Sequence, residues 1–418
     1  MGIFDIASAL VLLAALFGYL NLRFLKLPPT IGLMIIALVS SLAVILMDQI
    51  TPSYHMREII TKFIGQIDLN ETLMKGMLAF LLFAGALHVN FDDLYERRFS
   101  IAGLATVGVI ISTVLTGYAT YYIFKMAGLE IPLIYSLIFG ALISPTDPVA
   151  VIGILKTTRT SKSLEAKITG ESLFNDGVGI VIFIILVALA SAGPEAGFNI
   201  QDVTLLFFRE AFGGALLGFV FGYAAYMALK SIDNYQIEVL ITLALVMSIY
   251  STASLLHMSG PIAEVVAGLL VGNHGKRFAM STTTIDHVEK FWSLLDEILN
   301  AVLFLLIGLE VFAIQFKLSY LISGLLLIPT VLAVRFISVS IPISLLRFKR
   351  EFSKGVIRIL TWSGLRGGIS VALVLSLPPF QGRDLLLTCT YIVVLFSIIV
   401  QGLTLKPLVN RIQSGIKE

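Results

Sequence analysis

The sequence predicts an all-α polytopic membrane protein. Of its 418 residues, 57% are hydrophobic and only 13% are charged, and the mean hydropathy is +0.94. Apolar stretches of about 20 residues, the length that crosses a bilayer as a helix, recur from one end of the chain to the other. A transmembrane β-barrel is excluded, because segments of about ten residues with strict apolar and polar alternation are absent.

We expect about 13 spans, with ends placed to within several residues. They lie near 3–22, 28–48, 71–91, 100–125, 131–155, 163–191, 203–230, 236–257, 260–274, 286–315, 318–346, 355–378 and 384–407. Residues 3–22 lack the basic start and cleavage site of a signal peptide, so they are interpreted as a retained first span. The long connection 49–70 is expected to hold a short external amphipathic helix.

The loop charges predict the orientation. Alternate connections hold about 18 Lys and Arg residues, against about five on the others, and the basic side is cytoplasmic. This places the N-terminus outside and the C-terminus inside a cell membrane, surrounded by lipid. No soluble regulatory domain is expected. The single cysteine, Cys389, excludes an internal disulfide and a cysteine metal cluster, and no basic tract suggests nucleic acid as a partner.

The hydropathy pattern favours two inverted six-helix repeats. The first repeat covers about 1–191, a connecting helix covers about 203–230, and the second repeat covers about 236–407. The fifth span of each repeat is interrupted, and such a pair of broken spans predicts a transport site near the midplane. Since no repeat is visible residue by residue, this prediction rests on hydropathy.

The stretch SPTDPVAV, residues 144–151, interrupts the fifth span. Pro145 and Pro148 each remove a backbone donor and disfavour helix in the preceding residue. Thr146 and Asp147 are therefore expected on extended backbone, where freed carbonyls can bind a cation and Asp147 can offset the positive end of a half-helix. A proline kink with Asp147 as a helix N-cap is the alternative interpretation.

The stretch GESLFNDG, residues 170–177, is more specific. Ser172 and Asp176 are spaced i, i+4, as are Glu171 and Asn175, so all four lie on one broad helix face. A buried carboxylate costs several kcal/mol, roughly, unless it is paired or protonated. For Glu171 a structural ion pair is the favoured interpretation, whereas Asp176 is the candidate for binding an ion.

Two arginines lie within predicted spans, Arg335 in VLAVRFISV and Arg366 in the glycine-rich break GLRGG. An arginine in hydrocarbon must find an anion or face water. Arg335 is expected to pair with Glu171, and Arg366 to balance the negative end of a half-helix opposite Asp147. Both are predicted to stabilise the site rather than touch the ion.

Other polar residues give weaker signals. Four acids could line a funnel: Glu264, Asp296, Glu297 and Glu310. The default interpretation is that they snorkel to the membrane surface or cap a helix. His88, Asp92 and Asp93 are expected to meet solvent at the cytoplasmic end of the third span.

Seven motifs together resemble cation/proton antiporters of the NhaP and eukaryotic sodium/proton exchanger branch. They are FLLFAGAL (80–87), GALISPTDPVAV (140–151), GESLFNDGVGIVIF (170–183), FLLIGLE (304–310), AVRFISV (333–339), GLRGGISVAL (364–373) and VQGLTLKPLV (400–409). They occur in family order across nearly the whole chain.

The resemblance implies an NhaA-like antiporter fold with crossed discontinuous helices, assembled as a homodimer. It implies that Asp176 binds the ion and the proton, assisted by Ser172 and the Thr146 backbone, with Asp147 at the helix crossing. Asn175 matches the asparagine of the electroneutral branch. Glu171 with Arg335, and Arg366 at the crossing, would stabilise the site. In some relatives the third span adds a carboxylate, which FLLFAGAL lacks.

The function that the resemblance implies is electroneutral exchange of Na⁺ or Li⁺ for H⁺ by alternating access, supporting pH homeostasis, with no cofactor and no enzymatic activity. Cation and proton compete for one buried aspartate, because each neutralises the same charge. A K⁺/H⁺ antiporter of the same fold remains an alternative, since K⁺ also takes oxygen ligands. A passive cation channel and a sodium-coupled organic-anion symporter are alternatives from other classes.

Overall fold

The computed structural model describes residues 3–50, 77–148, 151–152, 162–192, 200–347 and 355–414, and all regular elements in these ranges are helical. Within these ranges, eight helices are long and apolar enough to cross a membrane. The predicted external helix at 49–70 and the first part of the third predicted span lie outside the described residues, except for 49–50 at the end of a helix.

The first part of the chain runs from α1 to α9. Its helices are α1 (Ile3–Leu20), α2 (Pro29–Ile50), α4 (Leu78–Leu87), α5 (Phe91–Gly103), α6 (Val109–Met126), α7 (Leu133–Ile143) and α9 (Lys162–Ala192), with π-helical turns η1 (Asn21–Leu25) and η4 (Leu104–Gly108). The fourth span was predicted to start near residue 100. That boundary is wrong, because Asn90 caps a helix that starts at Phe91 and accepts hydrogen bonds from the Asp92 and Asp93 amides.

The second part runs from α10 to α20. Its helices are α10 (Ile200–Phe208), α11 (Gly214–Lys230), α12 (Tyr235–Leu256), α13 (Gly260–Leu270), α14 (Lys276–Phe278), α15 (Thr282–Leu309), α16 (Leu318–Leu346), α17 (Val356–Trp362), α18 (Gly368–Leu375), α19 (Arg383–Phe396) and α20 (Gly402–Ser414). The irregular turns between them are η6 (Arg209–Gly213), η7 (Val271–Gly275), η8 (Glu310–Ala313) and η9 (Ser397–Gln401). The span boundaries predicted here agree with these bounds to within about four residues, except that the last span was predicted to end at 407 and its helix continues to Ser414.

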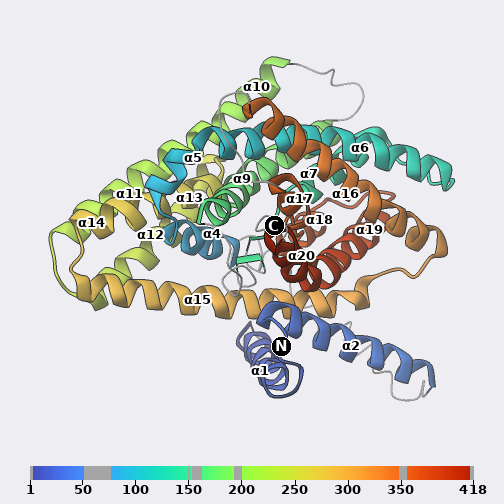
Figure 1. The fold of residues 1–418 in the computed structure, drawn as a ribbon, viewed down its shortest axis with the longest axis horizontal. Helices are drawn as coiled ribbons and strands as arrows, with labels where there is room; N and C mark the ends of the chain where they lie inside the picture. Colours follow the sequence, from blue (N-terminus) through green and yellow to red (C-terminus); the bar gives the residue numbers. More distant parts are fainter. Residues whose placement is uncertain are drawn as a thin grey trace.

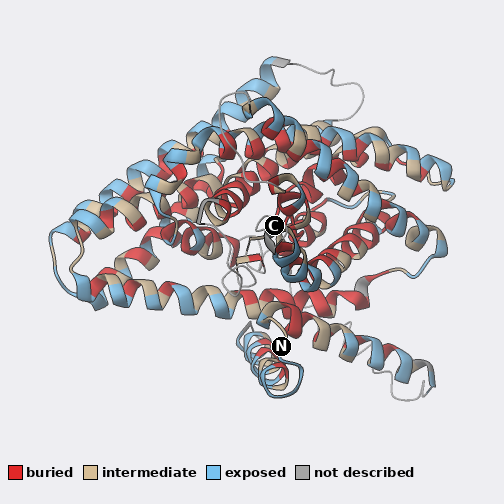
Figure 2. Cartoon of the chain, in the orientation of Figure 1, coloured by how far each residue is buried: buried red, intermediate tan, exposed pale blue. Residues whose placement is uncertain are grey.

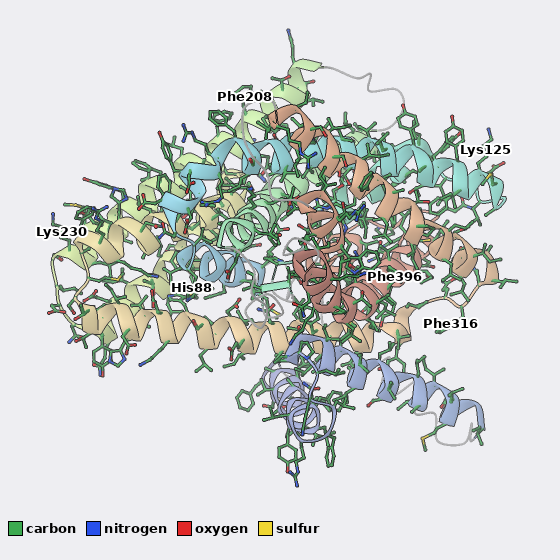
Figure 3. The ribbon with its side chains drawn as sticks, viewed as in Figure 1. His88, Lys125, Phe208, Lys230, Phe316 and Phe396 are labelled. Carbon is green, nitrogen blue, oxygen red and sulfur yellow. The ribbon has the colours of Figure 1, made fainter. Side chains whose placement is uncertain are left out.

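The long helices run lengthwise through the molecule (Figure 1). Helix α15 follows one side along nearly its whole length, and α2 packs against it. The labelled Lys230 and Lys125 lie at opposite ends of the long axis (Figure 3). Outer helix faces are exposed, and the buried residues gather towards the centre (Figure 2). The exposed side chains on these outer faces include large hydrophobic ones, as lipid contact requires.

Small residues set the closest helix contacts. A side chain at Gly218 of α11 would collide with the Ala263 backbone of α13, and one at Gly272 with the Leu87 backbone of α4. Such contacts are typical of membrane helices, where association depends on close van der Waals packing. They join α4, α11 and α13 into one wall of the molecule, which faces α9 through Ile262 and Gly177.

Candidate functional site

Two interrupted helices meet at the centre of the molecule. Helix α7 ends at Ile143, and α17 ends at Trp362 before α18 begins at Gly368. The Asp147 amide donates to the Leu365 carbonyl at 2.8 Å, so the two non-helical segments bond to each other. The predicted interruption at both positions is therefore present, and each break supplies backbone partners for the other.

Arg366 offsets the partial negative charge at the C-terminal end of α7. Its guanidinium is buried and donates to the Ser144 carbonyl, and to the Pro145 carbonyl at 3.0 Å. These carbonyls lie where α7 ends, and a helix carries partial negative charge at this end. The arrangement agrees with the predicted position of Arg366 opposite the first break.

Asp147 lies at the start of α18. A Cβ atom added to Gly367 would overlap the Asp147 carboxylate, so the side chain lies directly against the residue that precedes α18. The start of a helix carries partial positive charge, which favours a carboxylate there. Each break therefore places one charged side chain at the oppositely charged helix end of the other break.

Helix α9 carries the four predicted polar residues, and all four are buried. Asn175 Nδ2 donates to Thr146 Oγ1 at 2.8 Å, and Asn175 Oδ1 accepts from the Thr146 amide at 3.3 Å. Thr146 Oγ1 also lies 3.1 Å from Ser172 Oγ. Asn175 thus holds the first break against α9. Among the described residues no hydrogen bond reaches the Thr146 carbonyl oxygen.

Glu171 and Arg335 form the predicted ion pair. Arg335 Nη1 lies 2.5 Å from Glu171 Oε1, with 7% and 2% of the two side chains exposed. Arg335 Nη2 also donates to the Leu360 carbonyl at 3.2 Å. A Cβ at Gly364 would lie 2.6 Å from Arg335 Nε, so this glycine leaves room for the guanidinium beside the second break.

Asp176 differs from its neighbours on α9. Only 3% of the residue is exposed, and its Oδ1 has no hydrogen-bond partner among the described residues. It lines a cavity of about 1420 Å³ together with Asp147. Burial without a partner disfavours the bare carboxylate, so this site favours an Asp176 that is neutralised by a proton or by a bound cation.

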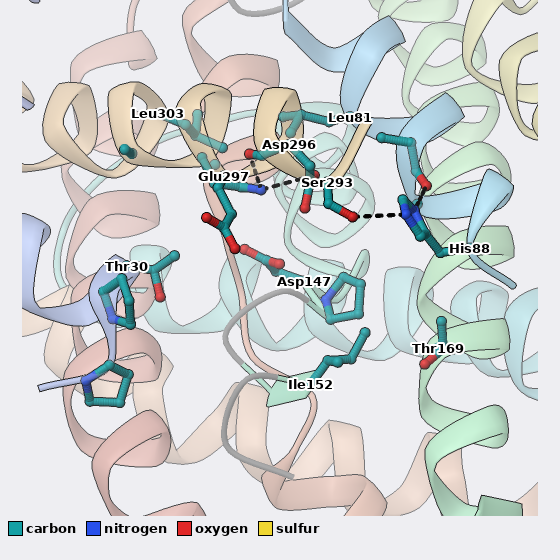
Figure 4. Close-up of a pocket in the computed structure, with 18 of the residues that line it drawn as sticks. Thr30, Leu81, His88, Asp147, Ile152, Thr169, Ser293, Asp296, Glu297 and Leu303 are labelled. Atoms are coloured by element: carbon teal, nitrogen blue, oxygen red, sulfur yellow. Dashed lines mark hydrogen bonds between the residues drawn. The ribbon is translucent and has the colours of Figure 1, made fainter. Parts of the chain in front are cut away.

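The cavity extends from this centre to polar residues of other segments. Its wall includes Lys26, His88 and Asn90, together with Leu173 and Gly368. Figure 4 shows Asp147 projecting into it from the break, with His88 and Ser293 on the opposite wall. Ser293 Oγ lies 3.0 Å from His88 Nε2, which joins α15 to α4.

The four acids that gave weaker signals in the sequence lie in two different environments. Asp296 and Glu297 line the cavity, so the possibility that they line a funnel is confirmed for these two. Glu264 and Glu310 are buried at 0% and 2% exposure and are not among the cavity-lining residues, which argues against a funnel position and against snorkelling, whereas Glu310 stands at the C-cap position of α15. Cys389 is buried in the core.

Sequence reasoning missed the residues that hold the second break. Ser397 Oγ accepts from the Arg366 amide at 2.9 Å and donates to Gln401 Oε1 at 2.7 Å. Gln401 Nε2 in turn donates to the Trp362 carbonyl at 3.1 Å. The polar positions in the apolar stretch SIIVQG were the available signal, because a membrane helix rarely buries such groups without partners.

The fold and the site define a polytopic helical membrane protein built around two interrupted helices and a buried carboxylate. Its fold matches the sodium/proton antiporter MjNhaP1 from Methanocaldococcus jannaschii, with a TM-score of 0.74, 20% identity, and 99% of each chain covered.

The family model for "Sodium/hydrogen exchanger, transmembrane" matches residues 11–411. The chain is 47% identical over 416 residues to the Na⁺/H⁺ antiporter NhaP of Pseudomonas aeruginosa, covering 98% of this chain and 97% of that protein. It is 36% identical to the Na⁺/H⁺ antiporter NhaH of Halobacillus dabanensis, over 93% of each. The chain belongs to the sodium/hydrogen exchanger family, which is a family of transporters and not of enzymes.

Proposed function

We propose that this protein exchanges Na⁺ for H⁺ across a cell membrane and that Asp176 binds the two ions alternately. The observation that carries the proposal is the Asp176 carboxylate, which is buried, lines the cavity and has no hydrogen-bond partner on Oδ1 among the described residues. The relatives named above, which carry the name Na⁺/H⁺ antiporter, support the choice of ions.

The residues around Asp176 suggest a cation site. Thr146 offers a backbone carbonyl that accepts no hydrogen bond from the described residues, and Ser172 offers a hydroxyl close to the same break. Hard monovalent cations prefer oxygen ligands of this kind, and Asp147 adds negative charge nearby. Asn175, Glu171, Arg335 and Arg366 hold the breaks and α9 in place, and we assign them a stabilising role.

A single carboxylate predicts electroneutral exchange. The proton-loaded and the Na⁺-loaded forms of Asp176 are both uncharged, so both can cross the closed middle of the protein, whereas the bare carboxylate is disfavoured there. The observed cavity corresponds to one open side. Alternating access requires a second conformation in which Asp176 faces the other side.

We further propose the finer architecture expected from the sequence. It comprises about 13 spans in two inverted repeats, a homodimer in the lipid bilayer, an external N-terminus and a cytoplasmic C-terminus. With this orientation, the cavity opens to the cytoplasm, because Lys26 and Lys406 line it.

Exchange in proteoliposomes tests the proposal. A pH-sensitive dye should report proton movement when Na⁺ or Li⁺ is added, and the rate should not change when a voltage is imposed. Transport of K⁺ at an equal or higher rate would favour the K⁺/H⁺ alternative. Current far above carrier turnover would indicate a channel, and Na⁺-driven anion uptake without proton movement would indicate a symporter.

A further inference from the structure

A second carboxylate projects into the cavity from the opposite wall. Glu297 lies on α15, and its side chain extends towards Asp147, which projects from the first break (Figure 4). No hydrogen bond or ion pair to the Glu297 carboxylate is found in the part of the chain that the structure describes. Its neighbour Asp296 differs, because Asp296 Oδ1 accepts from Asn300 Nδ2 at 3.0 Å.

The charges of the cavity favour a cation between these two walls. Among the described residues, six acids line it: Asp93, Asp147, Glu165, Asp176, Asp296 and Glu297. The basic residues on the described part of its wall are Lys26, His88 and Lys406. A cavity with walls of low dielectric concentrates this negative potential and raises the local cation concentration.

An independent feature points to a cation and not merely to a negative surface. Asp176 lines the same cavity, is only 3% exposed, and has an Oδ1 without a hydrogen-bond partner in the part of the chain that the structure describes. Helix α15 and the first break both line this cavity, so both can contact a cation that moves through it towards Asp176. The structure fixes Asp147 in the wall of this cavity, because Gly367 lies directly against its carboxylate.

We propose that Glu297 and Asp147 form a capture site that binds the transported monovalent cation before it reaches Asp176. The two carboxylates repel each other across the cavity, and one cation between them relieves this repulsion. Glu297 is then a residue that determines cation affinity from the open side. This inference rests on the proposed exchange function.

The Glu297→Gln substitution tests the capture site in proteoliposomes. Because Glu297 is exposed to the cavity, the variant should fold with the melting temperature of the wild type. Its KM for Na⁺ should rise roughly fivefold, equivalent to about 1 kcal/mol, while kcat stays near the wild-type value. Glu297→Asp, which keeps the charge on a shorter side chain, should give an intermediate KM.

Glu165→Gln is the matched control, because it removes one charge from the same cavity on a different helix. It should change the KM for Na⁺ less than twofold. A wild-type KM for Glu297→Gln, or an equal rise for both variants, would overturn the capture site. Wild-type protein without Na⁺/H⁺ exchange would instead overturn the proposed function, so the two failures are distinguishable.

Discussion

At the scale of single residues, Asp176 differs from its polar neighbours on α9 in its hydrogen bonding. Glu171, one turn earlier on α9, is paired with an arginine at 2.5 Å. Asn175 makes two hydrogen bonds with Thr146. Asp176 is equally buried, yet its Oδ1 has no partner among the described residues. A buried acid without a partner is costly unless it is neutralised, which agrees with a role in binding the transported ions.

The Asp176→Asn variant should lose Na⁺/H⁺ exchange while retaining its fold, because an amide can neither release a proton nor neutralise Na⁺. Proteoliposome exchange and size-exclusion chromatography measure the two effects. Asp286→Asn is a suitable control, since Asp286 forms an exposed ion pair with Lys290 on the same molecule. Robust Na⁺-dependent exchange by Asp176→Asn would remove this residue from the mechanism.

Breaking the Glu171–Arg335 pair should mainly lower stability. Either Glu171→Gln or Arg335→Ala leaves one buried charge without its partner, at a cost of about 3–5 kcal/mol. Thermal unfolding in detergent should show a clear fall in Tm for both variants. If Tm were unchanged while exchange vanished, the pair would act in transport itself.

At the scale of elements, the two breaks depend on each other. Arg366 of the second break donates to carbonyls at the end of α7, and Asp147 of the first break lies against the start of α18. The backbone bond from Asp147 to Leu365 joins the two segments directly. A disturbance of one break is therefore expected to displace the charged side chain of the other.

Gly367→Ala should impair exchange strongly, because the new methyl group would overlap the Asp147 carboxylate. We expect a loss of at least tenfold in kcat/KM for Na⁺, corresponding to about 1.4 kcal/mol or more. Gly18→Ala is the control, since nothing lies within 4 Å of a Cβ added there. Wild-type kinetics for Gly367→Ala would show that the position of Asp147 is not critical.

Some of these features could be predicted from the sequence and others could not, for physical reasons. Proline and glycine act locally, so the breaks at PTDP and GLRGG could be predicted from the chain. The pairing of Glu171 with Arg335 followed from the cost of burying each charge. The roles of Ser397 and Gln401 could not be predicted, because hydroxyl and amide groups have many possible partners. The start of α5 was missed because its first turn is charged and lacks a hydropathy signal.

At the scale of the whole molecule, the buried hydrophobic side chains form two clusters. One includes α7, α16 and α18, and the other includes α11, α12 and α13. The cavity lies between α9 with the two breaks and a wall that includes α4 and α15. Alternating access would need α9 and the breaks to move against this wall.

Cross-linking tests this motion, and the single native cysteine, Cys389, is buried and gives little background. A Cβ added to Gly85 of α4 would lie 4.0 Å from Leu173 Cδ1 of α9. A short bifunctional thiol reagent linking Gly85→Cys to Leu173→Cys should stop exchange. The pair Gly222→Cys and Ala267→Cys lies within the wall, with a Cβ separation of 3.4 Å, and its cross-link should leave exchange intact. Full activity of the first cross-linked pair would contradict the motion.

Competition between Na⁺ and H⁺ for Asp176 also predicts how transport depends on pH. A proton on Asp176 must leave before Na⁺ binds, so acidification should weaken the apparent affinity for Na⁺. Where Asp176 is mostly protonated, each pH unit of acidification should raise the KM for Na⁺ about tenfold. Exchange rates measured over a matrix of pH and Na⁺ concentration provide the check. A KM that is independent of pH throughout would be inconsistent with one shared carboxylate.

Proton release during Na⁺ binding tests the central claim most directly. Calorimetric titration of the purified protein with Na⁺, in buffers that differ in ionisation enthalpy, counts the protons released. At a pH where Asp176 is protonated, the wild type should release close to one proton for each Na⁺ bound, as expected when one charge serves both ions. Na⁺ binding that releases no proton, or an unchanged release in Asp176→Asn, would contradict the account.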